Sequence, residues 1–294
     1  MNTHVRYTAE LTTAMLSKNI RFLFVVFLLF STDANNSIFG AKILFIPANM
    51  NSHVLCFSRL AVDLTQLGHV TRVLAPSNAR VPQFVAEAEN GGNFSYTTYP
   101  VDGAEPYLNS RQVSEGLTRV AMSQSVWERF CGVSQLLKDV FARQESDCVR
   151  LLDNRDLMRQ IRAAGFQFAV MDGMIPQCYL AIPYSMRVRY AILSVPAMAW
   201  TYRVPRLPSF ASTLELGYTD RMTLFQRLTT FVFQILIMYR LRNDTTAYVD
   251  RLAPDRPSIS ASQLAQQVRL CIELKVPDSR ALRASSTCPR AIYT

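Results

Sequence analysis

Two short apolar segments flank an amphipathic one in residues 41–76. The segments 41–47 (AKILFIP) and 69–76 (HVTRVLAP) have the length and composition of buried strands. Between them the apolar residues recur at helical spacing: Phe57, Leu60, Ala61, Leu64 and Leu67. Gly68 then ends the predicted helix, because glycine readily takes the left-handed conformation found there. A strand, a helix and a strand in 36 residues predict a βαβ unit, which requires parallel strands and a right-handed crossover.

The same alternation continues along the chain. Strands are predicted at 93–101, 166–173 and 189–195, and helices at 81–90, 117–164 and 175–186. This order predicts an α/β domain with a doubly wound, mostly parallel sheet. The chain has 294 residues, of which 49% are hydrophobic, so it is long and apolar enough to bury a substantial core.

A further helix is predicted at 219–241, after an irregular, proline-rich stretch. Its segment FVFQILIMY is apolar all round except for Gln234, and it is too short to span a membrane. We favour a helix packed in the core or on the sheet. The alternative is a helix that lies in a membrane surface.

Residues 1–40 have the layout of a secretory signal peptide and its cleavage region. Lys18 and Arg21 follow Met15, an alternative initiator, and residues 22–30 form an uninterrupted apolar run. Small and polar residues come next, and nine apolar residues are too few to cross a bilayer. The pattern predicts entry into the secretory pathway, with the mature chain in the endoplasmic reticulum lumen or at its membrane surface.

In that compartment cysteines can form disulfides and asparagine sequons can be glycosylated. The six cysteines are candidates for disulfides, although a domain of this size does not require them. Sequons at Asn93 and Asn243 are predicted glycosylation sites, and a third at Asn35 lies near the expected cleavage point. With three histidines and no C-x-x-C pair, we predict no metal site.

The formal net charge of +9 comes from 31 basic and 22 acidic residues. The basic residues are scattered singly rather than clustered, which is typical of a solvated surface. We therefore predict no nucleic-acid partner, and keep a membrane surface as a partner for the helix at 219–241.

His53 and Asp172 each follow the end of a predicted strand. In a doubly wound sheet the carboxyl ends of the strands meet at one edge, where ligands bind, so the two side chains are expected to lie close together. A neutral histidine oriented by a buried aspartate is a general base for deprotonating a hydroxyl. On residue chemistry alone two other readings stay open: His53 as a helix cap or a packed ring, and Asp172 as a helix cap.

Four stretches together resemble a known family. They are AKILFIPANMNSHVLCFSRLAVDLTQLGHVTRVLAP, RAAGFQFAVMDGMIPQC, VPRLPSF and LGYTDRMTLFQRL, in this order. The sequence looks like the N-terminal half of a UDP-glycosyltransferase of the animal UDP-glucuronosyltransferase type. The resemblance implies that residues 41–274 form the N-terminal, acceptor-binding domain of a GT-B fold.

The resemblance also implies roles for particular residues. His53, in the Ser52–His53 pair, would be the catalytic base, and Asp172 would orient it. The base would deprotonate a hydroxyl of a small lipophilic acceptor, which attacks the sugar of a UDP-sugar with inversion; no cofactor is implied. We expect the acceptor pocket to involve the residues Met50, Asn51, Ser52, Trp127 and Met174. His69 matches a structural position in the family.

The C-terminal part departs from the family pattern. All ten glycines precede residue 218, no histidine follows His69, and no tryptophan follows Trp200. The family's donor-binding signature is not found, so we expect the C-terminal donor domain and membrane anchor to be absent, residues 275–294 to be a disordered tail, and the chain to be inactive alone. The alternative function is a non-catalytic acceptor-binding or regulatory partner that forms an oligomer with a full-length relative.

Overall fold

The computed structural model describes residues 40–107, 111–123, 125–194, 221–241, 245–266 and 270–273. The predicted signal peptide up to residue 39, the predicted tail at 275–294, and the sequon residues Asn35 and Asn243 lie outside these ranges.

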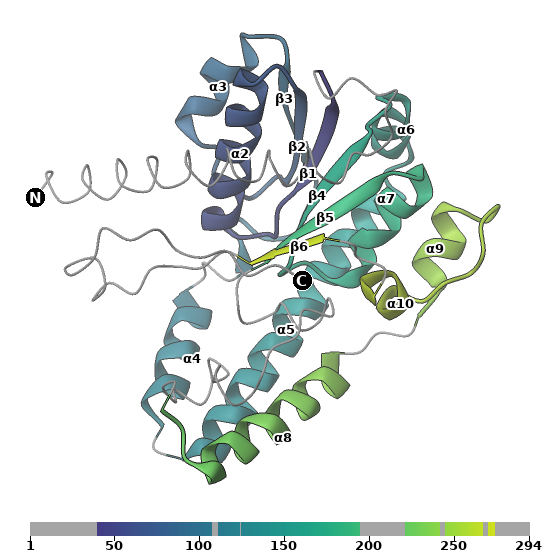
Figure 1. Ribbon diagram of the computed structural model, residues 1–294. Helices are drawn as coiled ribbons and strands as arrows, with labels where there is room; N and C mark the ends of the chain where they lie inside the picture. Colours follow the sequence, from purple (N-terminus) through teal and green to yellow (C-terminus); the bar gives the residue numbers. More distant parts are fainter. Residues whose placement is uncertain are drawn as a thin grey trace, which may run out of the picture.

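A six-stranded parallel sheet with the strand order β3-β2-β1-β4-β5-β6 forms the centre of the described structure (Figure 1). The strands are β1 (Lys42–Ile46), β2 (Val70–Pro76), β3 (Phe94–Tyr99), β4 (Phe168–Asp172), β5 (Arg189–Ser194) and β6 (Leu270–Glu273). The prediction of a doubly wound parallel sheet is therefore confirmed. The first five strands lie where the sequence predicts strands, whereas β6, which has only four residues, was not predicted.

The helices are α2 (Asn51–Gln66), α3 (Gln83–Glu89), α4 (Arg111–Met122), α5 (Val126–Asp153), α6 (Arg155–Ala163), the short 3-10 helix η2 (Gln177–Leu180), α7 (Ala181–Met186), α8 (Leu224–Leu241), α9 (Ala247–Leu252) and α10 (Ala261–Gln266). As predicted, α2 ends just before Gly68, which has a φ of +91°.

The single helical region predicted at 117–164 is wrong, because the chain forms three helices there, α4, α5 and α6. Two N-cap residues explain the breaks. The Ser125 side chain accepts a hydrogen bond from the backbone N–H of Glu128, and the Asn154 side chain accepts one from Leu157. Each cap satisfies a backbone donor at the start of a helix, so each begins a new helix inside an otherwise continuous periodic pattern.

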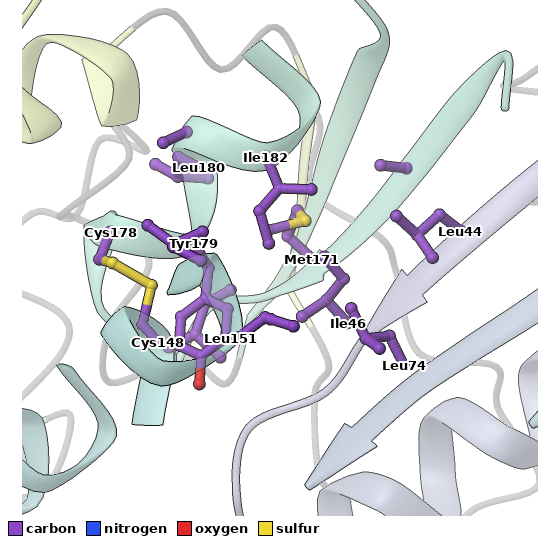
Figure 2. Packing of buried hydrophobic residues seen from close by; sticks show 14 of the residues in the cluster. Leu44, Ile46, Leu74, Cys148, Leu151, Met171, Cys178, Tyr179, Leu180 and Ile182 are labelled. Carbon is purple, nitrogen blue, oxygen red and sulfur yellow. A yellow bond between two sulfur atoms is a disulfide. The ribbon is translucent and has the colours of Figure 1, made fainter. Parts of the chain in front are cut away.

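The two faces of the sheet bury alternate residues of each strand. Ile43 and Phe45 of β1 pack with α2 in one hydrophobic cluster, whereas Leu44 and Ile46 face the other cluster, which holds residues of α5, α6, η2, α7, α9 and α10 (Figure 2). This period of two is the side-chain alternation of a strand. The fold therefore has helices on both faces of the sheet, with two separate cores.

A disulfide joins Cys148 of α5 to Cys178 of η2 within the second of these cores (Figure 2). Both cysteines are fully buried, and the bond ties the long helix α5 to the segment that follows β4. Two of the six candidate cysteines are therefore paired. Cys56 and Cys131 are free thiols in the described part of the chain.

Replacing Cys178 with alanine is expected to lower the melting temperature by roughly 10 °C, because the disulfide closes a 30-residue separation in the unfolded chain. Differential scanning calorimetry without reductant measures this change. Cys131→Ser is the matched control, because Cys131 is a free, partly buried thiol of the same helix. Equal melting temperatures for the wild type and Cys178→Ala would contradict a stabilising role for the bond.

Helix α8 packs against α5 and leaves its other face uncovered (Figure 1). Phe233 of α8 lies 4.2 Å from Phe130 of α5, measured between ring centroids. The outward residues of α8 are apolar and exposed: Leu224, Phe225, Leu228, Phe231, Val232, Ile235 and Tyr239. α8 thus covers α5 rather than the sheet, and within the described ranges no helix is long and apolar enough to cross a membrane.

Candidate functional site

The direction in which the chain adds strands to the sheet reverses between β1 and β4. From β1 the chain proceeds outward to β2 and β3, and from β4 it proceeds the other way to β5 and β6. β1 and β4 are neighbours, with Ile46 paired to Met171. The loops that leave these two strands diverge to opposite sides, and ligands bind in the crevice that forms at such a point.

His53 and Asp172 meet at this point of the sheet. Asp172 is the last residue of β4, and His53 lies in the first turn of α2, directly after β1. The Nδ1 atom of His53 lies 2.6 Å from Oδ2 of Asp172. The predicted juxtaposition of the two residues is therefore present in the structure. His53 is not the helix cap, because the N-cap of α2 is Met50.

Asp172 is held in one orientation by three donors. Its side chain is 2% exposed, and Oδ2 accepts hydrogen bonds from His53 Nδ1 and from the backbone N–H of Ala48 at 3.0 Å. Oδ1 accepts a bond of 2.9 Å from the backbone N–H of Met174. Because Nδ1 of His53 faces the carboxylate, it carries the donated proton, and Nε2 is left with a lone pair.

Opposing influences act on the pKa of His53. Burial is the largest and lowers it, but the hydrogen bond to Asp172 and the charge of Asp172 together outweigh burial, so the pKa is raised above its usual 6.5. The sequence could not decide between the aspartate and the helix N-terminus. In the structure the pKa of His53 is raised, which makes His53 a stronger base than a free histidine.

The other predicted acceptor residues fall into two groups. Met50, Asn51 and Ser52 lie at the start of α2 beside His53, and Met174 follows Asp172. Within this group, Oδ1 of Asn51 accepts a hydrogen bond from the backbone of Arg80, Ser52 is exposed, and Met174 packs partly buried against the core.

Trp127 lies apart from this group, in the first turn of α5. Its side chain is 61% exposed and contacts Phe130 and Phe233. Twenty residues of helix separate Trp127 from Asp147, a distance of about 30 Å along α5. The structure therefore does not bring Trp127 to the His53–Asp172 pair.

Three buried polar residues of the loop after β1 and of α5 were not identified from the sequence: Asn49, Gln144 and Asp147. Nδ2 of Asn49 donates a hydrogen bond of 3.0 Å to Oδ2 of Asp147. This bond links the loop after β1 to the C-terminal half of α5. The polar residues of α5 look like an ordinary solvated helix face in the sequence, so no pattern distinguished them.

These three residues line a cavity of about 520 Å³. Its other walls come from Tyr107 and the 102–105 loop and from Val140 and Arg143 of α5. The volume falls within the range of small-molecule sites. Asn49 directly follows Ala48, whose backbone N–H bonds to Asp172, so the cavity adjoins the loop that supports the pair. Neither His53 and Asp172 nor the five predicted acceptor residues line the cavity itself.

Three other possible functional groups are a cysteine nucleophile at Cys56, the second buried histidine, His69, and a metal site. The charge of Asp172 and, above all, burial raise the pKa of the Cys56 thiol to about 11, so this thiol is protonated at neutral pH and is a poor nucleophile. His69 is buried at the start of β2, and burial lowers its pKa, which fits the predicted structural role. Among the residues that the structure describes, no group of three or more histidine, cysteine, aspartate or glutamate side chains is arranged to hold a metal ion.

Comparison with known proteins gives one consistent result. Residues 41–264 match the family model UDPGT, UDP-glucuronosyl and UDP-glucosyl transferase. The chain is 25% identical over 218 residues to UDP-glucuronosyltransferase 1A5 of Rattus norvegicus, covering 71% of this chain and 38% of that protein. It is 25% identical over 219 residues to UDP-glucuronosyltransferase 2A3 of Mus musculus, covering 72% and 40%.

Among solved structures, UGT71G1 of Medicago truncatula complexed with UDP-glucose is similar over 80% of this chain and 51% of its own, with 9% identity and a TM-score of 0.40. The chain thus spans about two fifths of the length of the curated relatives that it matches.

Proposed function

The chain belongs to the UDP-glucuronosyl and UDP-glucosyl transferase family, and from this we propose that it supplies the acceptor site and the catalytic base of a UDP-glycosyltransferase. The observation that carries the proposal is the 2.6 Å contact between His53 Nδ1 and the buried Asp172 carboxylate. It lies at the point of the sheet where ligands bind in folds of this kind.

In the proposed reaction, Nε2 of His53 accepts the proton of an acceptor hydroxyl. The hydroxyl oxygen attacks the anomeric carbon of the sugar as the bond from that carbon to the UDP oxygen breaks, and UDP leaves with the electron pair. Attack from the side opposite UDP inverts the anomeric configuration. Asp172 keeps Nδ1 protonated and stabilises the imidazolium that forms, because its own position is fixed by Ala48 and Met174.

A fusion protein tests this proposal. We would join residues 41–274, which include α10 and β6, to the part of rat UDP-glucuronosyltransferase 1A5 that this chain does not match, and measure glucuronosyl transfer from UDP-glucuronic acid to 2-naphthol. Transfer is expected only when both parts are present. A folded fusion protein with no more activity than the rat part alone would contradict the proposal.

Two observations support a secretory-pathway location within the proposal. A buried disulfide forms and persists in an oxidising compartment. Asn93 is exposed immediately before β3, so a glycan at its sequon would meet no packed neighbour. Both fit a glycoprotein of the endoplasmic reticulum lumen.

The uncovered face of α8 supports a membrane surface as a partner. Leu224, Leu228, Ile235 and Tyr239 form a single stripe at helical spacing, and each is exposed. The net charge of +9 favours an anionic lipid surface over a neutral one. We propose that α8 lies in the plane of such a surface with this stripe inserted.

Vesicle flotation tests the contact. A chain that begins at Gly40, which removes the apolar run at 22–30, is expected to float with phosphatidylserine-containing vesicles. The double change Leu228→Asp with Ile235→Asp should reduce the bound fraction by about tenfold, because charged side chains on the inserted face are costly to bury. The control is the double change Leu55→Asp with Leu67→Asp, because both residues are exposed leucines of the α2 region. Equal flotation of the α8 variant and the wild type would exclude this surface as the contact.

A further inference from the structure

Gln144 is buried with its hydrogen-bonding capacity unused. Its side chain lines the cavity of about 520 Å³, and the residue is 4% exposed. Within the described part of the chain, neither Nε2 nor Oε1 of Gln144 has a hydrogen-bond partner. A buried amide without partners destabilises a fold, so such a group in a cavity points to a ligand that satisfies it.

Asn49 presents a second unsatisfied atom at the same cavity. Its Nδ2 bonds to Asp147, but its Oδ1 is buried and has no partner among the described residues. The two amides together therefore offer one donor group, Gln144 Nε2, and two acceptors, Gln144 Oε1 and Asn49 Oδ1. A hydroxyl group, which both donates and accepts, matches this set.

Four charged side chains line the cavity: three of them already have a partner, and the fourth, Glu105, lies in the exposed 102–105 loop. Asp102 is paired with Arg150, and the guanidinium of Arg143 lies 5.2 Å from the centre of the Tyr107 ring. Asp147 is held by Asn49. The unsatisfied buried atoms of the cavity therefore belong to neutral amides, with Val140 as an apolar neighbour of the cavity, and an uncharged hydroxyl suits them.

We infer that the acceptor carries a second hydroxyl, besides the one to which sugar is transferred, and that Gln144 and Asn49 bind it. The inference rests on the proposed function, because it places the reacting hydroxyl at His53 and the second at the amides. Asn49 directly follows Ala48, whose backbone N–H bonds to Asp172, so the inference requires an acceptor long enough to extend from His53 along this loop to the amides. The acceptor class is then a diol with an apolar body rather than a purely lipophilic alcohol.

Binding of matched naphthols to the full 294-residue chain tests this without any sugar donor. Isothermal titration would compare 2-naphthol with naphthalene-2,6-diol, naphthalene-2,7-diol and naphthalene-1,5-diol. The wild type is expected to bind at least one diol about tenfold more tightly than 2-naphthol, since two net hydrogen bonds account for such a ratio. Gln144→Leu should reduce that ratio to about one, because leucine fills the space but forms no hydrogen bond.

Gln135→Leu is the matched control, since Gln135 belongs to the same helix, is exposed and bonds only within it to Asp139. It should keep the tenfold ratio. Gln144→Met supplies a second, unbranched replacement in case Gln144→Leu does not fold. In the absence of ligand, Gln144→Met is expected to raise the melting temperature by a few degrees, because the unsatisfied amide is removed.

A wild type without preference for any diol, including one that binds none of the four compounds, would overturn the inference. So would a preference that persists in the Gln144 variants or is lost equally in Gln135→Leu. These results are distinct from a failure of the proposed function, which would appear as lost sugar transfer in the fusion protein while the diol preference of the chain is intact.

Discussion

His53→Ala in the fusion protein is expected to lower kcat/KM for glucuronosyl transfer by about 10³-fold, the usual contribution of a general base. Alanine removes the side chain that contacts the buried Asp172 carboxylate from the first turn of α2. Binding of the acceptor should change little, because the cavity is lined by Asn49 and by residues of α5 and the 102–105 loop. Steady-state kinetics with 2-naphthol, and a titration of the same compound, separate the two effects.

Gln66→Ala is the control for this change, since Gln66 is the exposed last residue of the same helix and contacts neither the pair nor the cavity. It should retain wild-type kinetics. If His53→Ala kept most of its activity, His53 would be a packed ring of the first turn and another group would have to accept the proton.

The pH dependence of kcat/KM adds an independent check on His53. The base acts in its neutral form, and its pKa is raised above 6.5 by Asp172. Activity should therefore be full at high pH and fall as the pH drops through this raised value, so the acidic limb lies above pH 6.5. In the Asp172→Asn variant the raising influence is lost and burial still lowers the pKa, so the limb should move to lower pH.

Asp172→Asn is expected to lower kcat/KM by about 10³- to 10⁴-fold. The asparagine amide offers an N–H to His53 where the carboxylate offered an oxygen, so the neutral ring turns to the tautomer that is protonated at Nε2. In that form Nε2 has no lone pair with which to accept the acceptor proton. The same kinetic assay measures the loss, and a nearly unchanged affinity for 2-naphthol should accompany it.

Asp156→Asn is the matched control, because Asp156 is an exposed carboxylate of α6 with only a surface ion pair to Arg159. The Asp172 variant should also melt at a lower temperature, since one amide oxygen replaces two carboxylate oxygens that receive Ala48 and Met174. Wild-type kinetics in Asp172→Asn would show that His53 needs no partner and would contradict the proposed division of roles.

The sheet and the contact between His53 and Asp172 could be predicted because both depend on local signals. Alternating apolar residues mark β1 and β4, and the polar residues that follow them in a parallel sheet meet at the same edge. Asn49, Gln144 and Asp147 gave no such signal. Each lies in a segment that is polar for ordinary reasons, and only the packing of α5 on the sheet buries them together. Trp127 shows the converse, since a conspicuous aromatic residue in the sequence lies far along α5.

The hydrogen bonds that hold Asp172 bear on which substitutions this protein can accept during evolution. Two of its three donors are backbone amides, those of Ala48 and Met174, and a side-chain substitution leaves a backbone amide in place. The walls of the neighbouring cavity, in contrast, are formed by side chains of α5 and the 102–105 loop. Under the proposed function, substitutions at positions such as Val140, Arg143 and Gln144 would change the acceptor while the geometry of the His53–Asp172 pair stays the same.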